Sequence, residues 1–349
     1  MKHFCAVLLL GAAILASAER AAATAESRAA VLFLLIEPGA RSHAMGESYV
    51  AIADDGTASY FNPAALSGQV DRKLNMTYMK WLPGLVSDMS YSFVGYAQPV
   101  QGWGNIGFNF GILDLGEQTR TDERGNELGH FRSYDMAVSG AYGAQVGQNV
   151  MAGVTLKYIY SHLTDQGAGV ELGSGVASSF AADVGLLWHT TPHLTFGAAL
   201  RNLGPKMAYI DASQADPLPE HITVGMGYEL LETQYHSVLL SLDVYKPLIS
   251  DGSFASNLVK AWADDPLKTE IEEMDLHVGG EYKYGLSSRL EDAFLALRAG
   301  YSMDHDGQLN LITTGLGLKY TRFQIDVAYI IGSETPMNDN TRFSLNLNL

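Results

Sequence analysis

The chain has 349 residues, with 38 acidic against 22 basic side chains and a formal net charge of −16. This balance excludes a nucleic-acid-binding protein of the usual kind, which needs a basic face. Charged residues make up only 17% of the chain, below the roughly 25% typical of soluble globular domains, while Gly and Tyr number 36 and 18. Composition thus favours a membrane β-barrel, with a secreted soluble β-rich protein as the alternative.

The first eighteen residues predict export. Lys2 supplies a positive start, an apolar run spans residues 4–15, and Ala16-Ser17-Ala18 forms a small-x-small cleavage site. We expect a signal peptide over 1–18. The only cysteine, Cys5, lies inside it, so the mature chain offers neither a disulfide nor a cysteine ligand.

Residues 19–68 form a predicted N-terminal extension and hatch. Residues 31–36 are continuously apolar, 39–46 predict a short helix and 49–53 a short strand. Asn62 and Pro63 have the residue types of an N-cap followed by a first-turn proline. Because residues 29–68 break the pattern of the rest of the chain, we expect them to plug the lumen of a barrel.

Residues 69–349 predict the barrel itself. Segments of about ten residues alternate apolar and polar side chains, as in a transmembrane strand. Fourteen such segments are expected: 72–81, 88–98, 103–114, 131–144, 149–162, 176–189, 193–202, 220–229, 235–246, 274–284, 290–302, 308–319, 321–331 and 341–349. Short and long connections alternate between them, as periplasmic turns and external loops do. The predicted fold is all-β: a 14-stranded antiparallel transmembrane barrel in the outer membrane.

The polar faces of these segments carry ionisable groups that a dry soluble core would not tolerate. These groups are Lys157, Asp183, Arg201, Asp243, Glu281, Lys283, Arg298 and Asp326. We expect them to face a wet or plugged lumen, with the apolar faces towards lipid.

No motif predicts a metal, a cofactor or catalysis. Asp54 and Asp55 are interpreted as a turn, because no further ligands follow at the spacing of a calcium loop. His189 and His193 flank a turn rather than share a helix face, which argues against zinc. No Gly-x-Ser-x-Gly elbow occurs. The protein is therefore not expected to be an enzyme, with a lipid hydrolase built from dispersed Ser and His as the alternative.

The 247–273 connection has apolar residues at helical spacing, Phe254, Leu258, Val259 and Trp262. They predict either a small helix folded over the barrel mouth or an apolar patch that faces a partner.

The N-terminal segment resembles the PorV/PorQ family. The resemblance rests on Gly39-Ala40-Arg41, Ala44-Met45-Gly46, Ala51-Ile52-Ala53-Asp54-Asp55 and Asn62-Pro63-Ala64. It continues in residues 201–206, 297–301 and 315–320. Its expected hatch residues are Gly39, Arg41, Met45, Gly46, Asp54, Asp55, Asn62 and Pro63.

The resemblance implies a FadL-like barrel of the type IX secretion system. Such a protein would sit in outer-membrane lipid, bind cargo that carries a C-terminal signal, and contact the translocon and the surface attachment complex. Two other functions stay open: a FadL-like transporter of hydrophobic small molecules and a lipid A-modifying enzyme.

Overall fold

A computed structural model describes residues 29–122, 124–164, 175–249, 260–262, 267–304, 309–331 and 340–349. The predicted signal peptide and Phe254, Leu258 and Val259 lie outside these residues. In the described part, no helix has the length and apolar character needed to cross a membrane.

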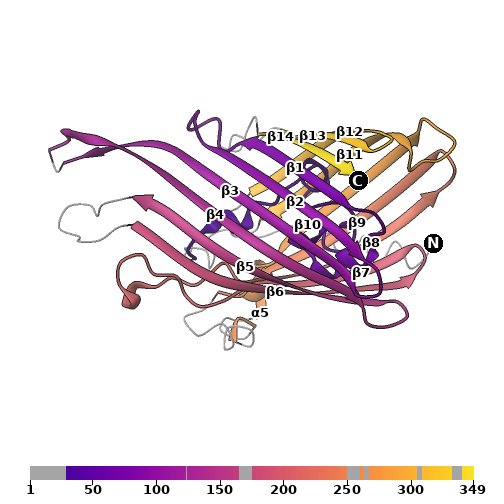
Figure 1. Cartoon of the computed structure of the whole chain (residues 1–349), viewed down its shortest axis with the longest axis horizontal. Helices are drawn as coiled ribbons and strands as arrows, with labels where there is room; N and C mark the ends of the chain where they lie inside the picture. The colour runs from indigo at the N-terminus through magenta and orange to yellow at the C-terminus, as the bar shows by residue number, and fades with distance from the viewer. Residues whose placement is uncertain are drawn as a thin grey trace.

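Fourteen antiparallel strands close into one barrel, in which each strand pairs with its sequence neighbours and β1 pairs with β14 (Figure 1). The strands are β1 (Lys73–Lys80), β2 (Ser90–Val100), β3 (Gly104–Thr121), β4 (Glu127–Gln145), β5 (Val150–Thr164), β6 (Gly175–Thr191), β7 (Leu194–Leu203), β8 (His221–Glu232), β9 (His236–Pro247), β10 (Asp275–Gly285), β11 (Ala293–Asp304), β12 (Leu309–Tyr320), β13 (Phe323–Ile331) and β14 (Thr341–Asn348). The predicted fold and strand number are confirmed.

Alternation along each strand separates an outer from an inner face. At the β1–β14 seam, Tyr78 stands opposite Phe343 and Thr77 opposite Ser344. Tyr78 and Phe343 are exposed, whereas Thr77 and Ser344 are buried and hydrogen-bonded at 2.8 Å. The apolar side chains therefore form the outer face, and the polar ones point inwards, as the two-residue period of a strand requires.

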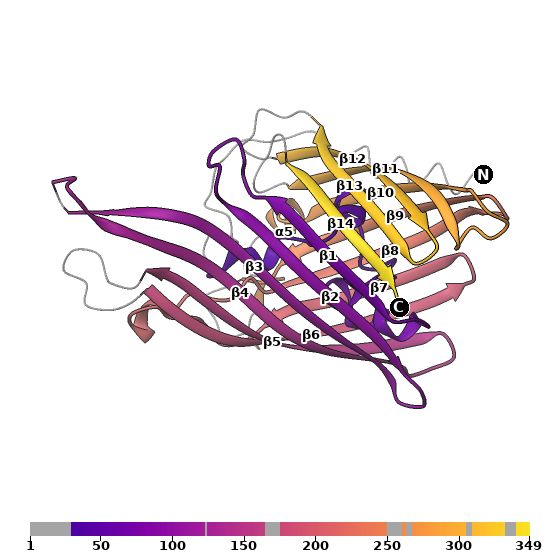
Figure 2. The same cartoon turned by 45° about the horizontal axis from the view of Figure 1, so that its top comes forward.

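The wall is uneven in height. β3 and β4 have 18 and 19 residues, while β1 and β14 have 8 each. The β3–β4 hairpin projects well beyond its neighbours (Figure 2). Most of the expected loop 115–130 is therefore strand, because the pairing continues past a bulge between Asp114 and Glu117 and ends with Thr121 opposite Glu127. The alternation is hidden there because both faces are polar and solvated.

The N-terminal segment runs inside the barrel (Figures 1 and 2). It contains η2 (Leu32–Leu35), α2 (Ala40–Ala44), α3 (Ala58–Phe61) and η3 (Pro63–Gly68). α2 contacts β11 to β14, and η3 contacts β2 to β6. The strand expected at 49–53 is not formed. That stretch is a turn whose Tyr49 and Val50 N–H groups donate to the Asp243 carboxylate of the wall rather than to a neighbouring strand.

Glycines on the inner wall let the backbone of the wall strands approach the backbone of the N-terminal segment. A Cβ on Gly300 of β11 would lie 1.9 Å from the Gly46 nitrogen, and one on Gly153 of β5 would lie 2.3 Å from the Pro63 carbonyl carbon. Glycines on β2, β4, β7 and β10 also meet backbone atoms of the segment, whereas those on β3, β6, β8 and β12 lie nearest to its side chains. Part of the high glycine content thus serves close approach of backbone to backbone.

The β7–β8 connection also folds inwards. Met207 and Leu218 are fully buried against the interior apolar cluster. Tyr209 donates a hydrogen bond to Ser161 of β5, and the Ala30 N–H donates to the Pro217 carbonyl. This loop therefore covers the N-terminal segment from the end of the barrel at which the longer connections lie.

Candidate functional site: the segment within the lumen

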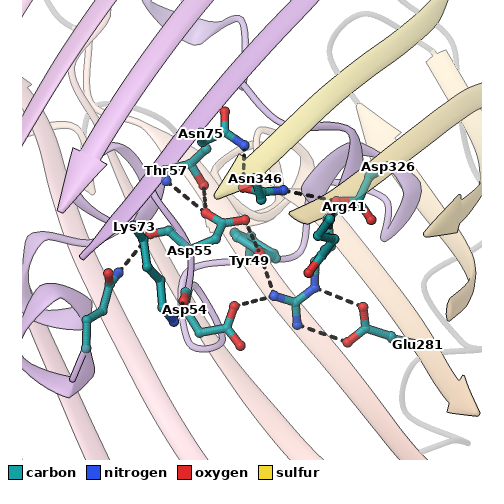
Figure 3. Close-up of polar contacts among 12 residues, drawn as sticks. Arg41, Tyr49, Asp54, Asp55, Thr57, Lys73, Asn75, Glu281, Asp326 and Asn346 are labelled. Carbon is teal, nitrogen blue, oxygen red and sulfur yellow. Dashed lines mark hydrogen bonds and ion pairs between the residues drawn. The ribbon is translucent and has the colours of Figure 1, made fainter. Parts of the chain in front are cut away.

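Arg41 of α2 joins the N-terminal segment to the wall (Figure 3). Its Nε and Nη2 each donate to a carboxylate oxygen of Glu281 on β10, both at 2.9 Å. Nη1 donates to Tyr49 at 2.9 Å and to Asp54. The bidentate geometry is the strong form of an arginine–carboxylate contact, and both partners are buried.

The charges continue around the wall beyond Glu281. Arg298 of β11 bridges Glu281 at 2.6 Å and Asp326 of β13 at 2.7 Å. Lys283 lies 3.0 Å from Glu281. The Asn346 amide of β14 donates to Asp326 at 3.0 Å. Glu281 and Asp326 are thus both compensated by cations or amides, as burial requires.

Asp54 and Asp55 are used in different ways. Asp54 pairs with Arg41, and its carbonyl accepts from Lys73 of β1. Asp55 accepts from the Thr57 N–H at 2.8 Å and from Tyr49 at 3.1 Å. The interpretation of Asp55 as a turn carboxylate agrees with this geometry, which is an Asx-type turn.

Met45 and Gly46 form the tightest contact with the wall. Gly46 has φ +64°, and a Cβ there would lie 2.6 Å from the Tyr301 nitrogen and 2.7 Å from the Val278 oxygen. Its N–H donates to Thr313 at 3.1 Å, and its carbonyl accepts from His277 at 2.8 Å. Both the positive φ at position 46 and the lack of space for a Cβ therefore require glycine.

Asp243 of β9 fixes the next turn of the segment. One of its carboxylate oxygens accepts the N–H groups of Tyr49 and Val50 at 2.7 and 2.8 Å. These bonds satisfy a backbone that pairs with no strand, which a buried segment requires.

Asn62 and Pro63 fulfil the predicted cap. The Asn62 side chain accepts from the Ala64 N–H at 3.1 Å, and Pro63 begins η3. The Asn62 amide also donates to the Val50 and Leu186 carbonyls at 3.0 and 2.9 Å. The cap therefore attaches the segment to β6 as well.

The opposite half of the lumen contains an apolar cluster. Phe33 and Leu34 of η2 lie with Tyr60 against Tyr91 and Phe93 of β2. Tyr60 donates to the Leu34 and Ile36 carbonyls at 2.8 and 3.0 Å. The cavity among these residues has a volume of about 30 Å³, close to that of one water molecule.

His43 is buried within the segment. Its Nδ1 lies 3.0 Å from Glu47. Burial, together with the nearby Arg342 guanidinium, lowers the pKa of His43 to about 4, against the opposing effect of Glu47. The imidazole is therefore neutral at pH 7 and donates from Nδ1 to the Glu47 carboxylate.

Of the four residues predicted to face a partner, only Trp262 belongs to the described residues. It is 48% exposed, and Lys246 of β9 lies 5.7 Å from its ring centre. Lys246 also pairs at 2.7 Å with Glu270 of α5 (Leu267–Glu272). This part of the loop is thus attached to the C-terminal end of β9, and its role in partner binding stays a prediction.

A closed antiparallel barrel with an apolar outer face and a charged, occupied interior defines the class: this is a β-barrel protein of the outer membrane. The family follows from the sequence. The family model described as type IX secretion system protein PorV matches residues 18–253, more than half of the chain, and the chain belongs to this family. The comparison with curated proteins finds no match.

Solved structures agree on the fold. The Ralstonia pickettii toluene transporter TbuX superposes with a TM-score of 0.52 at 15% identity, over 89% of this chain and 98% of that chain. The Pseudomonas putida toluene transporter TodX gives 0.51 at 12%, over 88% and 97%. The CymD monoaromatic hydrocarbon channel gives 0.51 at 13%, over 90% and 98%. At these identities the likeness concerns the fold alone.

The structure brings all eight predicted hatch residues into the lumen or its rim, yet the sequence did not show which wall residues they contact. It did not single out Glu281 or Asp243 as partners, nor Gly300 as the surface that meets Gly46. The sequence signal that could have pointed to these wall residues is the set of charged and glycine positions on the polar faces of the strands. Sequence shows which face they share, but not which of them meet the segment.

Proposed function

We propose that this protein serves type IX secretion as a closed barrel, which binds exported cargo at its surface and passes it to the attachment complex without conducting it through the lumen. The proposal combines the PorV family match with one structural observation: the segment that fills the lumen is held by buried charge pairs and close backbone contacts on most strands. In this proposal, residues 29–68 act as a fixed plug.

The interior supports this reading over transport of apolar molecules. A cavity that binds benzene has a volume of about 150 Å³, whereas the cavity beside Phe33 and Tyr60 has about 30 Å³. The inward-folded loop with Met207 and Leu218 covers it further. A route for toluene-sized molecules would require both the segment and this loop to move.

Cargo binding would then use the external end. β3 and β4 project beyond the barrel, and the β9–β10 connection carries the exposed Trp262. Surfaces of this kind present both polar and apolar groups to a protein partner.

The experiment is immunoprecipitation of the untagged protein from native outer membranes, with identification of the co-purifying chains by mass spectrometry. We expect translocon components and exported proteins that share a C-terminal signal. A second barrel from the same membranes serves as the control. If only lipid co-purifies, and vesicles containing the purified protein take up toluene faster than empty vesicles, the transport function is supported instead.

A further inference from the structure

A cluster at the turn end of β6 and β7 contains three side chains with metal-ligating atoms. His193 lies in the turn between these strands, and Glu229 and Glu232 lie near the end of β8. One ligand atom from each lies within 4.8 Å of the others. Among the described residues, no other group of three or more His, Cys, Asp or Glu converges in this way.

A β-bulge brings the two glutamates together. Residues three apart on a regular strand point to opposite faces. Here Glu229 pairs with Leu239, but Leu231 pairs with Val238 and Glu232 with Ser237, so the register shifts by one residue. Leu239 and Ser237 are two residues apart on β9 and so share a face. Their partners Glu229 and Glu232 therefore share a face as well. Bulges often re-aim side chains in this way next to functional sites.

The backbone fixes His193 against the same strand. The Glu229 N–H donates to the His193 carbonyl at 2.9 Å, and His193 Nδ1 lies 3.7 Å from the Glu229 carboxylate. In a tetrahedral zinc site with bonds of about 2.0–2.2 Å, neighbouring ligand atoms are about 3.3–3.6 Å apart. Only small rotations of exposed glutamate side chains separate the observed arrangement from that geometry.

We propose that His193, Glu229 and Glu232 bind one Zn²⁺ ion at the rim of the barrel, with water completing the tetrahedron. One imidazole and two carboxylates are a ligand set that zinc accepts. The His193 and Glu229 side chains are 56% and 43% exposed, so the ion is accessible to solvent. It connects the β6–β7 turn to the bulged end of β8. This inference goes beyond the proposed secretion function and departs from the sequence prediction of no metal site.

A second histidine with two glutamates provides a matched control. His130 lies 3.4 Å from Glu117 through Nδ1 and 3.0 Å from Glu127 through Nε2. Because the two carboxylates contact opposite ring nitrogens, they do not converge with one nitrogen on a single ion. His130 is as exposed as His193, so its loss tests for non-specific binding.

The experiment uses the full mature chain without a histidine tag, purified in detergent and freed of metal with a chelator. Calorimetric titration with ZnCl₂ should show one Zn²⁺ per chain, and Co²⁺ should give the intense visible absorption of a tetrahedral site. His193→Gln and Glu232→Gln should each weaken Zn²⁺ binding at least about tenfold, because even a group that only orients a ligand is worth this much. His130→Gln should bind as the native chain does.

Two results would overturn the proposal. One is the absence of stoichiometric Zn²⁺ binding by the native chain. The other is unchanged affinity in both His193→Gln and Glu232→Gln, which would mean an adventitious ion only. Heat-modifiable mobility on unboiled gels verifies that each variant is folded, as expected for neutral replacements at exposed positions.

Discussion

Arg41 in the N-terminal segment holds Glu281 of β10 through two parallel hydrogen bonds of 2.9 Å each. The two residues are 240 positions apart in the chain, and both are buried. A single side chain thus links the segment inside the barrel to the transmembrane wall.

Replacement of Arg41 by alanine should lower the free energy of unfolding by about 3 kcal/mol. This is the low end of the cost of removing one partner from a buried pair, because Arg298 and Lys283 still neutralise Glu281. Denaturant titration in lipid vesicles measures this change in the free energy of unfolding. Arg132→Ala is the matched control: Arg132 also contacts both oxygens of Asp114 but is 68% exposed, so its loss should cost at most about 1 kcal/mol. Equal effects would contradict the role assigned to Arg41.

Alanine at Gly300 should destabilise the protein by at least about 2 kcal/mol, since its Cβ would overlap the Met45–Gly46 backbone. Gly140→Ala on β4 is the control, because a Cβ there meets nothing within 4 Å. The stability of both variants is measured as the temperature at which heat-modifiable mobility is lost. If Gly300→Ala is as stable as Gly140→Ala, the segment does not lie against β11 in the membrane.

The contribution of His43 to stability should fall as the pH is lowered from 6.5 to 4. The folded pKa of His43 is about 4, below the unfolded value of 6.5, so in this window the unfolded chain binds a proton that the folded chain does not. The stability present above pH 6.5 is therefore lost as pH falls, by at most about 3 kcal/mol. In His43→Gln, the slope of unfolding free energy against pH should be smaller over this range. An unchanged slope would show that other groups account for it.

Removal of Phe343–Leu349 should abolish insertion, whereas trimming of 250–266 should not. β14 pairs with both β1 and β13, and without it two strand edges would face lipid with unsatisfied backbone groups. The 250–266 stretch belongs to a connection between strands. Outer-membrane fractionation with unboiled gels separates the outcomes. A truncated chain that still migrates as a compact barrel would mean that β14 is not the closing strand.

The sequence predicted the barrel because strand alternation is local: Phe343, Leu345 and Leu347 already show which face meets lipid. It predicted the Asn62–Pro63 cap for the same reason. It missed the long β3 and β4, where both faces are polar, and the turn at 49–53, whose hydrogen-bond partner Asp243 is almost 200 residues away. The His193 cluster was missed because a bulge in β8 re-aims Glu232. Such non-local contacts are set by register, which alternation alone does not reveal.

The central claim, that the protein works with its lumen closed, is tested most directly by locking the segment to the wall. Ala44 of α2 and Ala328 of β13 are fully buried in one apolar cluster, and the predicted mature chain has no native cysteine. Cysteines at both positions should form a disulfide, verified by thiol labelling and mass spectrometry. Surface attachment of exported cargo is then measured in cells that carry the oxidised double variant, with each single cysteine as a control. We predict native levels of attachment. Attachment that is lost in the oxidised protein and recovers on reduction would contradict the account, because it would show that the segment must move.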